Sequence, residues 1–338
     1  MPSFVTELLP VIVLVGLGAI LGARSILTVP TIDGLKRLVS GVTLPVLLFS
    51  AFSRMRPEAP HLILAVAIFA ACALMGLIGS AIARLFRLPS PATALMFQGF
   101  EAGMLGYALF ASFYGADRTP AFAAADLGQV LYVFTILMAR LGDDTPSGAP
   151  DGASAASSAS TRGAAENSAA GNGAKNLAAR LLSSPVIIAI GLGLIAALFA
   201  PEAKGMPWAP DGFLGSTLAA VGGLTTPLVC LVVGFGLKDG LAGAGKAATA
   251  VIARMLVAGA LGSLIGFVLV PALGFDRTHS FAVLTLFLLP PPFIIPVFRN
   301  EPKDAAYVSA TLSLHTVASL AAAALIAVVA QSVAGGAA

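Results

Sequence analysis

Glu101 is a lone carboxylate in an otherwise apolar stretch, with Gln98 three positions before it and Gly99, Gly103 and Gly106 around it. An ionisable side chain at bilayer depth is costly and persists mainly where it meets a partner or a water-filled path. A carboxyl group there can bind and release a proton, or hold Na⁺ together with backbone carbonyls. The pattern predicts a binding site for H⁺ or Na⁺ at Glu101. The structural alternative is a neutral or paired glutamate that locks two helices together.

A second candidate site is the proline triplet Pro290, Pro291 and Pro292, followed by Phe293. Consecutive prolines cannot continue an α-helix, because backbone donors are missing and the rings clash. The N-termini of half-helices at such a break direct partial positive charge toward an anion. We therefore expect the triplet and Phe293 to hold an anionic substrate together with Gly103 and Gly106. The glycines alone are equally typical of close helix packing.

Two Thr-Pro segments supply further candidates. We expect the two prolines to kink their helices beside the site, and the threonines to offer hydroxyl groups. These residues are Thr43, Pro45, Thr225, Thr226 and Pro227. For both prolines a purely structural role is the alternative.

Four more polar residues fall inside apolar stretches. The expected place of the Arg254 guanidinium is the lipid headgroup region, which a long side chain can reach, and the alternative is a carboxylate partner. His315 reads as a buried histidine rather than a proton relay. Asp126 and Gln129 are candidate solvated positions.

Most other functional classes lack support. No His, Cys and Asp cluster has metal-ligand spacing, and neither a phosphate-binding loop nor a nucleophile elbow occurs, so an enzyme or a cofactor is not expected. No basic cluster interleaved with aromatic residues suggests nucleic acid binding. Cys72 and Cys230 both lie in apolar segments, where buried thiols are common fillers.

The composition is that of a multi-pass membrane protein. Hydrophobic residues make up 58% of the 338 residues and charged residues 10%, and the mean hydropathy is +0.95. A membrane-crossing helix needs roughly 20 apolar residues, and ten stretches qualify. An all-α bundle follows, because helices satisfy their own backbone in lipid. The predicted spans cover residues 4–21, 32–52, 61–83, 90–113, 120–139, 184–200, 213–237, 246–270, 281–298 and 305–331.

The chain divides into two halves of five spans, residues 1–140 and 181–338. Residues 141–180 between them are rich in Ala, Ser, Gly, Asp and Asn, which predicts a flexible linker. Both halves carry a Thr-Pro segment in their second span and an interruption in their fourth, so the fourth and ninth spans are expected to be broken and to cross. Because five is odd, the second half must enter the membrane from the opposite side, which is an inverted repeat.

The loop charges predict the orientation in the membrane. Thirteen Lys and Arg residues lie in loops on the linker side and five in loops on the opposite side. Since cytoplasmic loops carry the excess of positive charge, we expect a cytoplasmic linker and both termini in the periplasm. Small-residue faces such as residues 318–327 would permit a homodimer.

The chain resembles the auxin efflux carrier family, whose bacterial members include carriers of malonate-like organic acids. The resemblance spans both halves apart from the linker. The segments that carry it are Gly-Val-Thr-Leu-Pro-Val-Leu-Leu-Phe at residues 41–49, Gly-Met-Leu-Gly at 103–106, Tyr-Gly at 114–115, Ser-Pro-Val-Ile-Ile-Ala-Ile-Gly-Leu-Gly at 184–193, Thr-Pro-Leu at 226–228, Val-Gly-Phe-Gly-Leu at 233–237 and Leu-Pro-Pro-Pro-Phe at 289–293.

The resemblance implies a ten-span secondary carrier with a mobile domain and a scaffold domain. In that family the broken fourth and ninth helices cross near the membrane midplane and frame the substrate. The family pattern in the fourth span commonly has an Asn, then Gly-x-x-Gly and a Pro. Here Glu101 stands at the position of the Asn and Ala108 at that of the Pro. A neutral amide is thus replaced by a group that can carry a proton.

The sequence therefore predicts a carrier of a small organic anion, a carboxylate, in a bacterial inner membrane. Transport would proceed by alternating access and be coupled to H⁺ or Na⁺. Two alternatives remain within transport, a cation/proton antiporter and a bile-acid-type sodium symporter. A membrane sensor that keeps the carrier fold without flux is the alternative from another class.

Overall fold

The structure of the protein is a computed structural model that describes residues 2–55, 58–143, 184–200, 205–236, 244–293, 295 and 302–335. Throughout these ranges the secondary structure is helical, and no strand occurs in them. The predicted linker lies outside the described residues except for residues 141–143. The all-α prediction is confirmed for the described part of the chain.

The helices follow the predicted spans closely. In the first half they are α1 (Pro2–Ala23), α2 (Val29–Leu38), η1 (Val39–Thr43), α3 (Leu44–Phe52), α4 (Ala59–Leu85), α5 (Ser90–Met96), η2 (Ala102–Gly106), α6 (Tyr107–Tyr114), η3 (Ala116–Arg118), α7 (Thr119–Tyr132), η4 (Val133–Leu137) and α8 (Met138–Asp143). In the second half they are α10 (Pro185–Phe199), α11 (Gly215–Gly223), α12 (Thr225–Gly236), α13 (Ala244–Leu264), η7 (Ile265–Leu269), α14 (Val270–Ala272), α15 (Arg277–Leu288) and α17 (Pro302–Gly335).

Six helical stretches of the described chain are long and apolar enough to cross a membrane. They are Val29–Phe52, Ala59–Leu85, Ala116–Leu141, Gly215–Gly236, Gly245–Ala272 and Ala306–Ile326, which coincide with the second, third, fifth, seventh, eighth and tenth predicted spans. Val13–Ala23 and Pro185–Phe199 are shorter apolar helices at the first and sixth predicted spans. The fourth and ninth predicted spans are interrupted, so neither forms one long helix. The described residues thus contain enough membrane-crossing helices for a multi-pass protein. The full number of ten spans stays a prediction.

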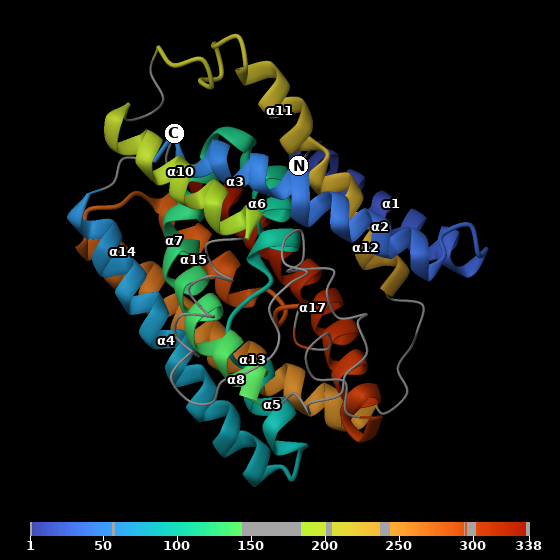
Figure 1. The fold of residues 1–338 in the computed structure, drawn as a ribbon. Helices are drawn as coiled ribbons and strands as arrows, with labels where there is room; N and C mark the ends of the chain where they lie inside the picture. Colours follow the sequence, from blue (N-terminus) through green and yellow to red (C-terminus); the bar gives the residue numbers. More distant parts are fainter. Residues whose placement is uncertain are drawn as a thin grey trace, which may run out of the picture.

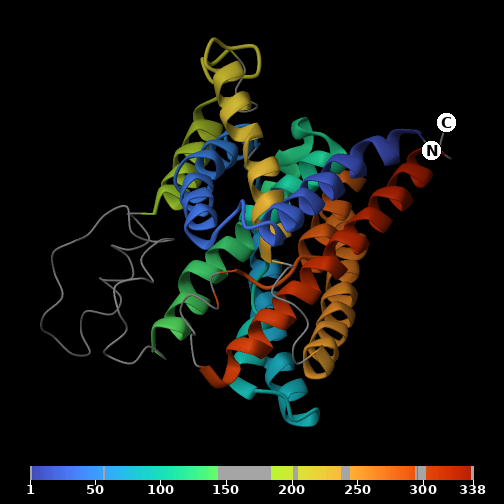
Figure 2. The same ribbon diagram turned by 90° about the vertical axis from the view of Figure 1, so that its right-hand side faces the viewer.

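The helices pack in two groups. In one, α1 packs against α12, and α3 packs against both α10 and α11. In the other, α4 packs against α5 and α7, and α13 packs against α15 and α17. Figure 1 shows the first group at the top of the view and α4, α5, α8 and α13 below it. In Figure 2 the start of α1 and the end of α17 lie toward the same end of the molecule, and the two helices are in contact.

Glycine residues allow close approach of helices within each group. A Cβ atom on Gly234 of α12 would lie 2.0 Å from the carbonyl oxygen of Val15 in α1, and one on Gly128 of α7 would lie 2.0 Å from that of Ala65 in α4. Such contacts between backbones are typical of helix packing in membranes, where close van der Waals contact replaces the hydrophobic effect.

The two interrupted segments meet between the groups. The first interruption covers residues 97–101, between α5 and η2, and the second begins after α15 at Leu289. Phe100 of the first interruption and Phe287 at the end of α15 have ring centroids 4.8 Å apart. Buried side chains from both halves surround this place, including Phe122, Leu286 and Tyr107.

Candidate functional site

Glu101 joins the two interrupted segments by both its backbone and its side chain. Its backbone N–H donates to the carbonyl oxygen of Pro290 at 2.9 Å. Its carboxylate Oε2 accepts the backbone N–H of Phe293 at 2.5 Å. The side chain is nearly buried, with 9% of the residue exposed. The residues predicted to hold the ion and the substrate, Glu101 and the proline segment, are therefore in direct contact.

The first interruption depends on Gly99. Its φ of +71° lies in the left-handed region, which side chains with a Cβ seldom adopt. A Cβ there would also lie 2.7 Å from Cγ2 of Val133 and 3.2 Å from Cγ of Pro292. Gly99 thus lets the backbone turn and brings it against the proline triplet of the second interruption.

The other two predicted glycines lie in the helix that follows the interruption rather than in the interruption itself. Gly103 and Gly106 belong to η2, a single π-helical turn, and the Gly106 N–H donates to the carbonyl oxygen of Glu101 at 3.0 Å. A Cβ on Gly106 would lie 2.6 Å from Leu289, and one on Gly103 would lie 3.2 Å from Leu44 of α3. Gly106 therefore faces the second interruption, and Gly103 faces the other helix group.

Arg254 of α13 corrects the sequence prediction for this residue. The guanidinium does not extend to a headgroup region, because Arg254 is 1% exposed. Its Nη2 donates to the Gly99 carbonyl and its Nη1 to the Leu289 carbonyl, each at 2.7 Å. Both carbonyls belong to the interruptions, whose backbone groups have lost their helical partners. The side chain points into the protein because these carbonyls satisfy the guanidinium better than an apolar surrounding would.

Two further groups surround the Arg254 guanidinium. Its Nη1 lies 3.0 Å from Nε2 of His315, and its Cζ lies 5.2 Å from the centre of the Phe100 ring. Because arginine only donates, Nε2 of His315 must accept, which leaves the ring neutral with its proton on Nδ1. His315 is fully buried in α17. This agrees with the prediction of a buried histidine.

Gln98 forms a polar contact between three helices. Its Oε1 accepts the Tyr132 hydroxyl at 2.8 Å and Nη1 of Arg140 at 3.1 Å, and its Nε2 donates to the Ala94 carbonyl at 2.9 Å. These bonds use both ends of the amide. Arg140 is exposed on α8, so its hydrogen bond with Gln98 connects the first interruption to the protein surface.

The Thr-Pro segments lie in two irregular helical stretches, η1 with α3 and α11 with α12. Pro45 follows the π-helical turn η1, and Pro227 follows the turn at Leu224 between α11 and α12, so both helices are irregular just before their proline. The α12 helix packs against η2. The hydroxyls of Thr43 and Thr225 are buried without a hydrogen-bond partner, whereas Thr226 is half-buried. Their roles in binding stay predictions.

A second buried carboxyl group belongs to Asp126 of α7, which is 1% exposed. It interacts electrostatically with Glu101. One helical turn further on, Nε2 of Gln129 donates to the Phe100 carbonyl at 2.8 Å. Both residues are thus buried next to the first interruption, and the expectation that they occupy solvated positions was wrong.

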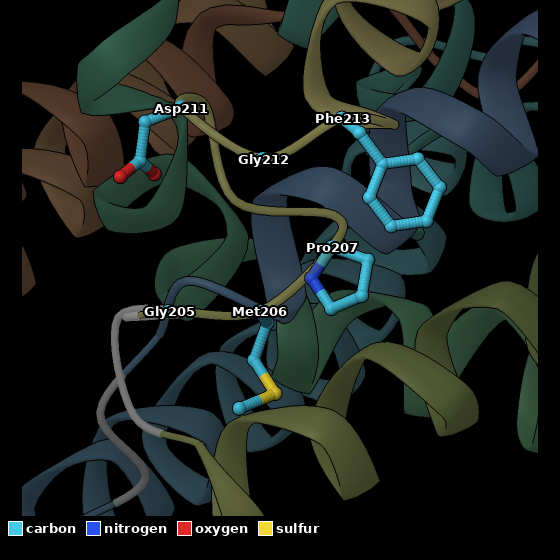
Figure 3. A pocket seen from close by; sticks show the side chains of 6 residues that line it. All are labelled: Gly205, Met206, Pro207, Asp211, Gly212 and Phe213. Atoms are coloured by element: carbon cyan, nitrogen blue, oxygen red, sulfur yellow. The ribbon is translucent and has the colours of Figure 1, made fainter.

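A hollow on the surface lies away from these residues. Gly205, Met206, Pro207, Asp211, Gly212 and Phe213 line it in the loop before α11 (Figure 3). The loop closes on itself through hydrogen bonds such as that from the Leu214 N–H to the Pro207 carbonyl at 2.9 Å. No predicted site residue lines this hollow. Among the described residues no three His, Cys, Asp or Glu side chains are placed to hold a metal ion.

The sequence prediction missed the partners that fix the site. Arg254 was assigned to the wrong environment, and Tyr132 and Arg140 were not identified. A cation in the middle of an apolar helix was the available signal for Arg254, since such residues mostly face the interior of a bundle. No local pattern identifies the other two, because their partner Gln98 is distant in the sequence.

The match to a protein-family model agrees with the resemblance found in the sequence. No curated protein matches the chain. The model of a family described as "Membrane transport protein" matches residues 3–332, which is nearly the whole chain. Members of this family are transporters rather than enzymes. The chain therefore belongs to the membrane transport protein family, that of the auxin efflux carriers.

Proposed function

We propose that the protein carries a small organic anion, a carboxylate, across the membrane by alternating access, coupled to H⁺. The observation that carries the proposal is the bond from the Phe293 N–H to the Glu101 carboxylate. A backbone donor in a helix interruption is a binding group for an anionic substrate. Here an internal carboxylate occupies that donor, so the site already accommodates the functional group of the proposed substrate.

The charges around the site explain why a proton and an anion would bind together. Buried charges must be balanced to be tolerated. The Arg254 guanidinium is buried and donates to the carbonyl of Gly99, two residues before Glu101. In the proposed mechanism the Glu101 carboxylate offsets its charge. Protonation of Glu101 leaves one positive charge unbalanced. An organic anion restores neutrality, so one H⁺ and one carboxylate are expected to bind at the same time.

Competition for the Phe293 N–H provides the coupling. A carboxylate accepts this hydrogen bond more strongly than a protonated carboxyl group does, because charge-assisted bonds are roughly twice as strong as neutral ones. Protonation of Glu101 therefore frees the N–H for the substrate carboxylate. Loss of the proton lets Glu101 return and displace the substrate. The substrate is therefore released on the side of the membrane with the higher pH, where Glu101 loses its proton.

The same geometry favours H⁺ over Na⁺ as the coupling ion. Carriers with broken helices commonly coordinate Na⁺ with backbone carbonyls freed at the break. Here the guanidinium of Arg254 donates to two such carbonyls, those of Gly99 and Leu289. A permanent internal cation thus uses oxygens that a Na⁺ near Glu101 would need.

The packing of the helices supports ten spans in two inverted repeats, residues 1–140 and 181–338. An inverted repeat requires that each contact recurs between the corresponding helices of the other half. The contact of α1 with α12 corresponds to that of α10 with α3, and the contact of α4 with α7 to that of α13 with α17. The contact of α7 with α15 likewise corresponds to that of α17 with α6. The start of α1 and the end of α17 also lie toward the same end of the molecule, as an even number of spans requires (Figure 2).

Alternating access would move one helix group against the other. The group of α4, α5, α7, α13, α15 and α17 contains both interruptions and Arg254, so it would carry the substrate. The group of α1, α3, α10, α11 and α12 would be the scaffold, and its small-residue faces or those of α17 would permit a homodimer. The membrane is proposed to be a bacterial inner membrane, with the linker in the cytoplasm and both termini in the periplasm. Labelling of an engineered Cys in the linker by an impermeant reagent on intact cells would contradict this orientation.

Counterflow in proteoliposomes tests the proposed function. Vesicles loaded with unlabelled malonate or a related acid should take up the radiolabelled acid, and an imposed pH gradient should drive accumulation. An imposed Na⁺ gradient should have no effect. Cation-dependent proton release without any organic substrate would favour a cation/proton antiporter, and Na⁺-driven uptake a bile-acid-type symporter. Binding without flux would favour a sensor.

A further inference from the structure

Arg140 is an exposed cation whose side chain reaches a fully buried one. It lies in α8, and its Nη1 donates to Oε1 of Gln98 at 3.1 Å. Gln98 is 1% exposed and belongs to the first interruption, three positions before Glu101. A guanidinium that contacts both solvent and this amide lies at the boundary between the surface and the site. Transport through Glu101 and Phe293 alone does not explain this position.

Hydrogen bonds determine the orientation of the Gln98 amide. Arginine only donates, so the amide atom that faces Arg140 must be the oxygen. The Ala94 carbonyl only accepts, so the atom that faces it must be the nitrogen. The Tyr132 hydroxyl donates to the same amide oxygen at 2.8 Å. Because Oε1 accepts two hydrogen bonds, departure of Arg140 would still leave Gln98 with a partner at each end of the amide.

The bond from Arg140 to Gln98 is one that an anion can replace. Within the described part of the chain, Arg140 uses only Nη1 in a hydrogen bond, and its side chain is exposed. The amide of Gln98 is neutral and offers this guanidinium one oxygen. A carboxylate offers a negative charge and two oxygens that match the planar fork of a guanidinium. A carboxylate from solution is therefore the better partner for Arg140.

The place of Arg140 in the fold determines from which side it meets a substrate. The elements α7, η4 and α8 form one continuous helical stretch from Thr119 to Asp143. At the start of this stretch the scaffold helix α3 packs against α7, and Nη2 of Arg54 lies 3.4 Å from both Oγ1 of Thr119 and the Ala116 carbonyl. Arg140 is exposed at the other end, and Figure 1 shows α8 well below α3. It thus faces the side on which the predicted linker begins.

We propose that Arg140 is the first group to bind the substrate carboxylate on the linker side, and that the substrate replaces Gln98 on the guanidinium. In the empty site Gln98 holds Arg140 beside the first interruption. When the organic anion binds, Arg140 pairs with its carboxylate, and Gln98 keeps the hydroxyl of Tyr132. The anion then passes to the Phe293 N–H. This inference rests on the proposed function and adds a substrate-recruiting residue to it.

A purely structural role for Arg140 leads to different expectations. If Arg140 only held Gln98 in place, removal of the other donor in Tyr132→Phe would weaken binding in the same way. Added salt would then have little effect on the difference between a variant and the wild type. A recruiting cation acts through its charge, which dissolved ions screen at an exposed position. The salt dependence of binding therefore separates the two roles.

Binding of malonate to the full-length protein in detergent tests the proposal. Calorimetry at one fixed pH and increasing choline chloride, which adds no Na⁺, should give a wild-type Kd that rises with ionic strength. Arg140→Gln should bind roughly two- to fivefold more weakly at low salt, the range for one exposed ion pair, and lose most of the salt dependence. Arg140→Lys should restore the salt dependence, because it keeps the charge. The matched control is Arg84→Gln at the exposed end of α4, which should bind as the wild type does.

Transport kinetics give a second readout. In membrane vesicles of known orientation, Arg140→Gln should raise the KM for malonate offered on the linker side by a similar factor. The kcat should change little, because the proton-binding group Glu101 is intact. The KM on the opposite side should stay as it is in the wild type. A rise in KM that is equal on both sides would contradict the assignment of Arg140 to the linker side.

Two outcomes of the binding experiment would overturn the inference. One is an equal Kd for the wild type and Arg140→Gln at every salt concentration. The other is a weakening in Arg140→Gln that Tyr132→Phe reproduces and that salt does not affect, since Arg140 would then only position Gln98. If Arg140→Gln does not fold, as its melting temperature would show, a loss of salt dependence in the charged variant Arg140→Lys would overturn it. Absence of malonate binding in the wild type would instead contradict the proposed function itself.

Discussion

The backbone N–H of Phe293 donates to Oε2 of Glu101 at 2.5 Å, although the residues are 192 positions apart in the chain. This bond connects the two interrupted helices and places an internal carboxylate on a donor suited to an anion. In the proposed function, the strength of this bond depends on the protonation of Glu101. The predictions below concern the groups that hold this arrangement.

Arg254 should be essential for the stability of both interruptions. Arg254→Met removes two charge-assisted hydrogen bonds, to the carbonyls of Gly99 and Leu289, of roughly 1.5–3 kcal/mol each. Arg254→Lys should recover only part of this, because one ammonium group does not reproduce the planar fork of a guanidinium. Thermal unfolding in detergent measures the effect. The control is Arg84→Met at the exposed end of α4, and equal melting temperatures for the two Met variants would contradict the assignment.

Gly99 should not tolerate a side chain. Gly99→Ala combines a left-handed backbone, which costs an L residue about 1–2 kcal/mol, with a Cβ 2.7 Å from Val133. Gly274→Ala has the same backbone strain at a φ of +82° but nothing within 4 Å of the new Cβ. Unfolding and transport measured for both variants separate the two causes. We expect Gly274→Ala to lose only stability, and Gly99→Ala to lose transport as well. Normal transport by Gly99→Ala would show that the site does not need this close approach.

Gly76 of α4 keeps Gln98 in place. A Cβ at Gly76 would lie 2.7 Å from Cγ of Gln98, so Gly76→Ala should displace the amide from Tyr132 and Arg140. Overpacking of this kind typically costs 1–3 kcal/mol. Gly16→Ala in α1 is the matched control, because nothing lies within 4 Å of its new Cβ and Ala is the better helix former by about 1 kcal/mol. An unfolding free energy that rises in both variants would contradict the predicted clash.

Asp276 should make the stability depend on acid pH. It is the N-cap of α15 and accepts the His279 backbone N–H at 3.2 Å. Burial raises the pKa of the Asp276 carboxyl, but its hydrogen bonds with His279 outweigh burial and hold the pKa below the ordinary value. Because the folded pKa is lowered, this stabilisation is present above the unfolded pKa of about 4 and is lost as the pH falls through the folded pKa.

Substitutions of Asp276 test this pH dependence. Asp276→Ala should cost about 1 kcal/mol near neutral pH, and the difference from the wild type should shrink below about pH 4. Asp276→Asn should keep the cap at every pH, since Asn is an equally good N-cap. Melting temperatures recorded against pH measure both variants. A difference between wild type and Asp276→Ala that grows in acid would have the wrong sign.

The interruptions could be predicted from the sequence because glycine and proline act on the local backbone. Gly99 and the triplet Pro290, Pro291 and Pro292 fall where the helices stop. The span positions could be predicted for the same reason, since a run of apolar residues is a local property. The predicted extent of the first interruption was less accurate. The helix resumes before Gly103 and Gly106, because both residues belong to η2.

Contacts across the fold could not be predicted in this way. Whether Arg254 turns toward lipid or toward the interior depends on the rotation of α13 against α15 and α17, which no local pattern records. The bonds of Gln98 to Tyr132 and Arg140 likewise join residues 34 and 42 positions away. The inverted repeat, the coupling ion and the roles of Thr43, Thr226 and the prolines of α3 and α12 stay predictions.

Uptake under an imposed pH gradient by the wild type and Glu101→Gln in proteoliposomes tests the central claim most directly. The exposed Asp117→Asn is the control for loss of a negative charge. The account predicts pH-driven accumulation of the labelled acid in the wild type and the control, and no response to the gradient in Glu101→Gln, whose side chain cannot take up or release the coupling proton. Transport by Glu101→Gln at the wild-type rate with unchanged pH dependence would contradict it.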